Sequence, residues 1–86
     1  MEDKEFIINK IIEEVLEKIS NEDKVVINFK DIVGNFEVGF TTAYTIMAIL
    51  EKKIPKILGN GIKVFRRRGK LIILKEEEKT EEGYGV

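Results

Sequence analysis

Residues 62–75, IKVFRRRGKLIILK, decide the fold, because two runs of β-branched and aliphatic residues flank a short basic centre. The centre, Arg66–Lys70, holds four cations and one glycine, and we call it the hairpin tip. Glycine supplies the positive φ that a tight turn needs. A turn centred on Arg68-Gly69 sets the pairs of a hairpin: Arg67 with Lys70, Phe65 with Ile72, and Val64 with Ile73. The stretch therefore predicts a two-stranded β-hairpin with a basic tip.

The charge of the hairpin tip indicates a binding role. Four like charges at the end of a hairpin repel one another and gain nothing from packing. A polyanion gives a physical reason for placing them there. We therefore expect this tip to contact nucleic acid or another strongly acidic partner.

Composition limits the classes of function. Eighty-six residues make one small domain with a modest core. The chain has no cysteine and no histidine, which removes thiolate chemistry and the commonest general base and metal ligand. No glycine-rich phosphate loop occurs. We therefore expect no enzyme activity, no cofactor and no metal site.

Residue usage also bears on the source and the location of the protein. The chain contains 14 Ile, 12 Lys and 13 Glu, with no Gln. Enrichment in Lys and Glu is typical of hyperthermophiles, so we expect a thermophilic prokaryote, and among these an archaeon. No apolar run has membrane-spanning length, and the chain does not begin like a secretory signal. The expected location is the cytoplasm, in association with the nucleoid.

A nearly neutral total hides a segregated charge pattern. The formal net charge is −1. Residues 1–23 carry eight acids and three bases, a net of −5, and residues 76–86 carry five acids and one base, a net of −4. Residues 24–75 between them carry eleven bases and three acids, a net of +8. This asymmetry indicates nucleic acid more strongly than the overall charge does.

The first predicted element is an amphipathic helix from Asp3 to Ile19. Its apolar positions follow helical spacing: Ile8, Ile11, Ile12, Val15 and Ile19. Phe6, Ile7 and Leu16 lie off this stripe. They are either additional core or a two-fold interface between two copies of the chain.

A short strand and a short helix follow. Val25–Ile27 is a β-branched run and predicts a strand. Asn28 offers an N-cap for a helix through Val33. Gly34-Asn35 is expected to end that helix, because both residues tolerate the left-handed conformation. Phe36–Gly39 then forms a turn.

A longer helix is predicted from Phe40 to Ile54. One stripe is apolar at helical spacing: Ala43, Ile46, Met47, Leu50 and Ile54. The opposite face carries short, hydroxylated or cationic side chains and no acid: Thr41, Thr45, Ala48 and Lys52. Such a face suits close approach to a DNA groove, although an ordinary solvated face explains it equally well.

The end of this helix has two interpretations. Pro55 stops or kinks it. Residues 55–58 then form either a last turn or a further strand, because Asn60-Gly61 is itself a good hairpin turn. Since Ile57 and Leu58 continue the helical period, we predict a last turn.

The chain ends in dense negative charge. Residues 76–86, EEEKTEEGYGV, have no apolar periodicity and predict an acidic, disordered tail. The predicted domain therefore covers residues 1–75. The tail either keeps the protein soluble, competes with DNA for the basic surface, or docks a basic partner.

The predicted order of elements resembles that of a winged helix-turn-helix domain of the small archaeal type. The resemblance covers residues 3–75. It matches 28–35 to the first helix of the motif, 36–39 to its turn and 40–54 to the recognition helix, with the hairpin as the wing. The implied fold class is α+β, with three helices, one short strand and a C-terminal β-hairpin. In this family the recognition helix lies in the major groove, and the wing reaches the adjacent backbone or minor groove.

The resemblance implies a set of DNA-binding residues. From the helix these are Thr41, Thr42, Tyr44, Thr45 and Lys52, and from the wing they are Arg66, Arg67, Arg68 and Lys70. Arginine suits phosphates and a narrow minor groove. The outer face of the helix has no Arg, Gln or Asn for bidentate base reading, so specificity is expected to be limited.

Two functions remain open. The first is a small transcriptional regulator or chromosome-associated protein that binds duplex DNA. The alternative is a protein-interaction module, an accessory subunit of a replication or transcription complex, because members of this family also bind proteins and the acidic ends suit that role. A homodimer is compatible with either function.

Overall fold

The structure is a computed structural model that describes residues 3–76. The predicted disordered tail falls almost wholly on 77–86, outside the described residues. The described part is α+β, in the order α1 (Lys4–Ile19), β1 (Lys24–Asn28), α2 (Phe29–Phe36), α3 (Phe40–Leu58), β2 (Ile62–Arg67) and β3 (Lys70–Lys75). This order agrees with the predicted order of elements.

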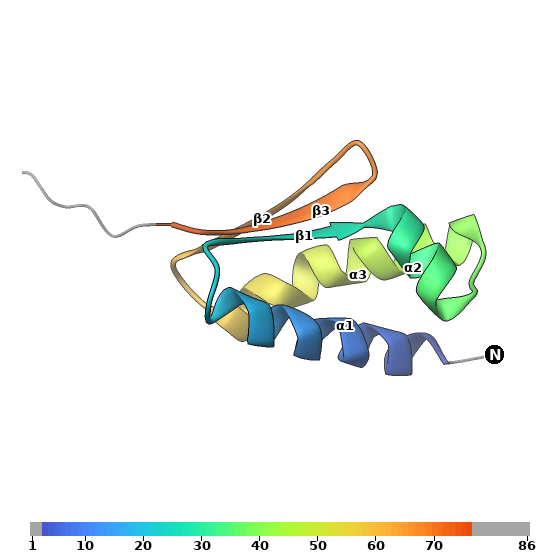
Figure 1. Cartoon of the computed structure of the whole chain (residues 1–86), viewed down its shortest axis with the longest axis horizontal. Coiled ribbons are helices and arrows are strands. Elements are labelled where there is room, and N and C mark those ends of the chain that lie inside the picture. Colours follow the sequence, from blue (N-terminus) through green and yellow to red (C-terminus); the bar gives the residue numbers. More distant parts are fainter. Residues whose placement is uncertain (1–2, 77–86) are drawn as a thin grey trace, which may run out of the picture.

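The three strands form one antiparallel sheet in the order β1-β3-β2. Figure 1 shows this sheet along one side of the molecule and α1 along the other, with α3 between them in this view. Alternate residues of the central strand β3 point into the core, where Leu71 and Ile73 are fully buried. Within residues 3–76 no helix covers the other face of the sheet (Figure 1).

The β2–β3 hairpin has the predicted register. Arg67 lies opposite Lys70, Phe65 opposite Ile72 and Val64 opposite Ile73. The two turn residues both adopt positive φ, 49° at Arg68 and 77° at Gly69. This is the backbone of a two-residue turn whose twist matches that of the strands. Arginine is less suited to this conformation than Asn or Gly, so its presence at the turn is not explained by backbone preference.

The core lies between the helices and the inner face of the sheet. Its largest fully buried side chains come from all three helices and from β3: Ile7, Val15, Ile32, Ile46, Met47, Leu50, Ile54, Leu71 and Ile73. The predicted apolar stripe of α3 is buried at every position. Of the three α1 residues off the main stripe, Ile7 belongs to the core, whereas Phe6 and Leu16 are exposed.

Asn28 links the sheet to the helices. It ends β1, and its side-chain oxygen accepts a hydrogen bond of 2.9 Å from the backbone N–H of Lys30. This is the predicted N-cap of α2, and it satisfies one N–H that the first turn of a helix leaves unpaired. The lone strand predicted around Val26 is therefore an edge strand of the sheet that leads directly into α2.

The predicted end of the short helix differs from the structure. The short helix does not end at Gly34-Asn35: α2 continues to Phe36, and Glu37 takes the left-handed conformation at φ 54°. The continuation brings Phe36 against the core, and this packing outweighs the tendency of glycine and asparagine to end the helix. The turn is accordingly shorter than predicted.

The helix α3 continues through Pro55 to Leu58. This agrees with the prediction that residues 55–58 form a last turn and not a further strand. Leu58 packs against the core, and the backbone N–H of Gly59 donates to the carbonyl of Pro55 at 2.9 Å. Packing and this C-terminal bond offset the hydrogen bond that proline cannot make.

Within residues 3–76 no single helix is both long and apolar enough to cross a membrane.

Candidate nucleic-acid interface

The hairpin tip is tied to the first residue of α2. The backbone N–H of Phe29 donates to the carbonyl of Gly69 at 2.8 Å. A Cβ built at Gly69 would lie 3.9 Å from the Cβ of Phe29. The tip of the hairpin is thereby fixed relative to the helices.

An aromatic cluster continues this link to α3. The Phe29 ring stacks on Tyr44 with centroids 4.2 Å apart, and it meets Phe40 at 5.3 Å in a tilted arrangement. Pairs of this kind contribute about 0.5–1.5 kcal/mol beyond the area that they bury. Phe29 is buried, while Tyr44 remains 50% exposed. The cluster therefore holds an accessible tyrosine beside the basic tip.

The tyrosine and the hairpin tip enclose a shallow hollow. Its lining combines one aromatic ring with the whole basic tip: Tyr44, Met47, Arg66, Arg67, Arg68, Gly69 and Lys70. Residues from the predicted recognition helix and from the predicted wing thus meet in space. No charged or polar side chain is buried anywhere in residues 3–76, so the candidate site is a surface.

Arg66 is held differently from the rest of the tip. Its Nε lies 2.9 Å from Oε1 of Glu51 on α3, and both side chains are partly exposed. Glu51 follows Tyr44 by seven residues, which is nearly two helical turns. The two side chains therefore lie on the same side of α3. Sequence reasoning missed this ion pair, since no local signal connects residues fifteen positions apart in different elements.

The predicted helix residues do not share one face. Thr41 and Lys52 are exposed, and Thr45 is half-buried. The Thr45 hydroxyl donates to the carbonyl of Thr41 at 3.0 Å, so its proton is used within the helix. Thr42 is half-buried and lies about 160° round the helix axis from Tyr44. Thr42 therefore lies away from the side of α3 that borders the hairpin tip.

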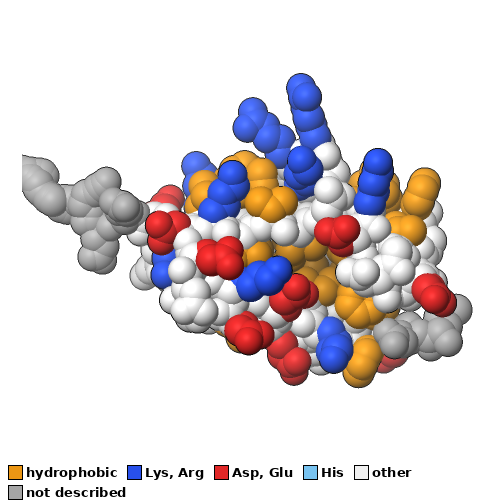
Figure 2. Space-filling view, in the orientation of Figure 1, with side chains coloured by type: hydrophobic (Ala, Val, Ile, Leu, Met, Phe, Trp, Pro, Cys, Tyr) orange, Lys and Arg blue, Asp and Glu red, His pale blue; other side chains and the backbone are white. Residues whose placement is uncertain are grey.

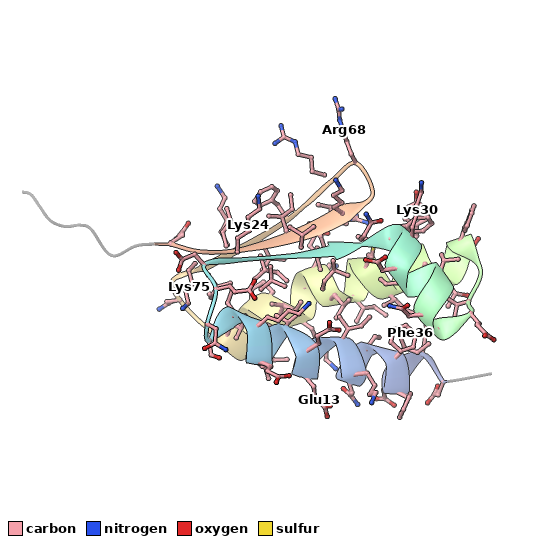
Figure 3. The ribbon with its side chains drawn as sticks, viewed as in Figure 1. Glu13, Lys24, Lys30, Phe36, Arg68 and Lys75 are labelled. Carbon is pink, nitrogen blue, oxygen red and sulfur yellow. The ribbon has the colours of Figure 1, made fainter. Side chains whose placement is uncertain are left out.

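Lys30 is a further cation on this side of the molecule. Figure 3 shows its side chain pointing to the same side as Arg68, while Glu13 on α1 points to the opposite side. Lys30 is exposed, and it is the residue whose N–H the Asn28 cap binds. The sequence gives no reason to include Lys30, because its relation to the hairpin depends on how β1 pairs with β3.

The surface charge follows the same division. Figure 2 shows Lys and Arg side chains gathered along the edge formed by the hairpin, while most acidic side chains in this view lie over the opposite part. The first turn of α3 contains no acid. Anionic groups can therefore approach the N-terminus of α3 and the hairpin tip together.

Comparison with protein families, curated proteins and solved structures finds no significant match for this chain.

Proposed function

We propose that this chain is a winged-helix protein that binds duplex DNA through α3 and the hairpin tip. The observation that carries the proposal is the hollow in which Tyr44 of α3 borders the basic tip from Arg66 to Lys70. Supporting it, the element order, the three helices and the antiparallel sheet are compatible with a winged helix. With these contacts the protein would act as a small transcriptional regulator or as a chromosome-associated protein.

The proposed contacts fall into two groups. Thr41 and the N-terminal N–H groups of α3 contact phosphates at the edge of the major groove, with Lys52 further along the helix. Arg67, Arg68 and Lys70 contact the neighbouring backbone or enter the minor groove. Lys30, from α2, adds a phosphate contact.

Affinity is proposed to depend on the tip more than on the helix. Base-specific contacts favour Arg, Asn or Gln with bidentate geometry, and the outer stripe of α3 carries two threonines, an alanine and a lysine. The hydroxyl proton of Thr45 is already bonded to the helix backbone. Binding is therefore expected with limited preference among DNA sequences.

A salt titration tests the proposal. Five exposed cations among the proposed contacts are not paired with a carboxylate within residues 3–76: Lys30, Lys52, Arg67, Arg68 and Lys70. If each neutralises one phosphate, log K should fall with log salt at a slope of about −4.5. Fluorescence anisotropy of labelled duplexes of several sequences at three salt concentrations measures this slope. An interaction that is undetectable or insensitive to salt would show that the proposal is wrong.

A further inference from the structure

The outer face of the sheet is a second surface with an ordered pattern. The strand pairing places nine side chains in three rows across β1, β3 and β2. The rows are Asn28–Lys70–Arg67, then Val26–Ile72–Phe65, then Lys24–Leu74–Lys63. In β1 and β3 these residues alternate with core residues, and in β2 they alternate with Ile62 and Val64, which pack against the core, so they share the face that points away from the helices.

The middle row is entirely apolar and accessible. Val26 is 44% exposed, and Ile72 and Phe65 are each half-buried. Leu74 extends the apolar surface into the next row and is also half-buried. A contiguous apolar surface with a polar rim marks an interaction site more often than isolated exposed residues do.

Cations lie on both sides of this row. Arg67 and Lys70 occupy one flanking row, and Lys24 and Lys63 occupy the other, with no acid among the nine residues. The Lys63 ammonium lies 5.8 Å from the centroid of the Phe65 ring. Within residues 3–76 none of the four cations is paired with a carboxylate. Figure 3 shows Lys24 pointing to the same side as Arg68, away from the helices.

We propose that this face docks an acidic amphipathic helix of a partner protein. The apolar side chains of that helix would lie along the Val26–Ile72–Phe65 row, and its carboxylates would meet the cations on both sides. The row crosses three strands and spans about 10 Å, the length of about two helical turns. Each flanking row is two residues away along the strands, about 7 Å, which side chains on either flank of one helix can reach.

The arrangement favours a protein over a single-stranded nucleic acid. A single strand needs aromatic side chains on which successive bases stack, and Phe65 is the one aromatic residue among these nine. Phosphates also run along one side of the bases, whereas the cations here lie on two sides of the apolar row. Arg67 and Lys70 also belong to the proposed DNA contacts, but the inference goes beyond those contacts, because Val26, Ile72 and Lys24 belong to neither α3 nor the hairpin tip.

The probe for the test is a synthetic helical peptide of about 14 residues. It carries Leu at every third or fourth position and Glu on both flanks of that apolar stripe. One control peptide has the same composition in scrambled order, and a second has Lys in place of Glu. Amide chemical shifts of the full-length, isotope-labelled protein are recorded during the titration. Binding of the acidic amphipathic peptide alone, with shifts centred on Val26, Ile72 and Phe65, is the expected result.

Paired variants separate a specific surface from general charge. K24E/K63E reverses the outer flanking row and should weaken peptide binding by about tenfold. K53E/K56E makes the same charge change on exposed residues of α3 and should leave binding within about twofold. Val26→Ser keeps the charge and shortens the apolar row, and it should weaken binding by about threefold to tenfold. Equal effects of the two charge reversals would overturn the proposal.

The same titration identifies other occupants, each of which would also overturn it. If oligo-dT moves these resonances and the acidic peptide does not, the surface binds single-stranded nucleic acid. If E77Q/E78Q/E81Q/E82Q in the full chain shifts them without any peptide, the acidic C-terminal residues occupy the face. If they shift with protein concentration alone, a second copy does. None of these outcomes depends on whether α3 and the hairpin tip bind duplex DNA.

Discussion

Replacing Glu51 with glutamine is expected to increase the affinity for duplex DNA. In the structure the carboxylate of Glu51 holds the guanidinium of Arg66 at 2.9 Å. The ion pair neutralises one of the four cations of the hairpin tip, and it places an acid beside the proposed interface. Glutamine keeps the size of the side chain and removes its charge, so Arg66 becomes available to a phosphate.

The magnitude follows from counterion release. One additional phosphate contact makes the slope of log K against log salt steeper by about 0.9. Near 0.1 M salt this corresponds to about 1 kcal/mol, or roughly a threefold to tenfold gain in affinity. The stability of the fold should change little, because ion pairs on a protein surface contribute about 0.2–1 kcal/mol.

The assay compares E51Q with E14Q by anisotropy of one labelled duplex. Glu14 is a matched control, because it forms a partly exposed ion pair of 3.1 Å with Lys18 on α1. Each variant removes one acid and breaks one surface ion pair. Only E51Q releases a cation at the hairpin tip, so only E51Q should gain affinity and a steeper salt slope.

A double-mutant cycle isolates the role of Arg66. In the unmodified chain R66Q should weaken binding, because it leaves the Glu51 carboxylate without its partner beside the proposed interface. In the E51Q background the same R66Q change should remove the gain. If E51Q and E14Q bind the duplex equally well, Arg66 does not lie at the DNA interface, and the reasoning from this ion pair is refuted.

Three further predictions concern the hairpin tip and the cap that positions it. Arg67→Ala and Arg68→Ala should each reduce the salt slope by about 1 and weaken binding to all duplex sequences alike, which anisotropy with several duplexes measures. Gly69→Ala should cost about 1–2 kcal/mol in the free energy of unfolding, because φ there is 77°, and urea titration followed by circular dichroism checks this. Asn28→Ala removes the N-cap bond to Lys30 and should cost about 0.5–2 kcal/mol in the same assay, whereas Asn9→Ala on the exposed side of α1 should cost clearly less.

Local patterns in the sequence were sufficient to predict most of the helices and strands. The hairpin register followed from one Arg-Gly turn, because turn chemistry and strand alternation act over a few residues. The buried stripe of α3 followed from helical spacing alone. The predicted end of α2 was wrong, because Phe36 packs against residues distant in the sequence. The local stop signal at Gly34-Asn35 carries no information about that packing.

The candidate site was predicted less completely, because it depends on contacts between distant parts of the chain. Pairing of β1 with β3 joins Val26 to Ile72, and it creates the three-row face that no single segment reveals. The Glu51–Arg66 ion pair likewise needs α3 and β2 side by side. Nothing in the sequence distinguishes Phe29 from other apolar residues, and only the structure shows its link between Gly69 and Tyr44.

Chemical-shift mapping with duplex DNA tests the central claim most directly. The labelled full-length protein is titrated with a short duplex, and the amide shifts are assigned to the elements of the fold. Shifts concentrated in α3 between Phe40 and Lys52 and in residues 66–70, with α1 unchanged, are the predicted result. Shifts confined to α1 or to the middle of the outer sheet face, or no shifts at saturating duplex, would contradict the claim that α3 and the hairpin tip form a DNA-binding surface.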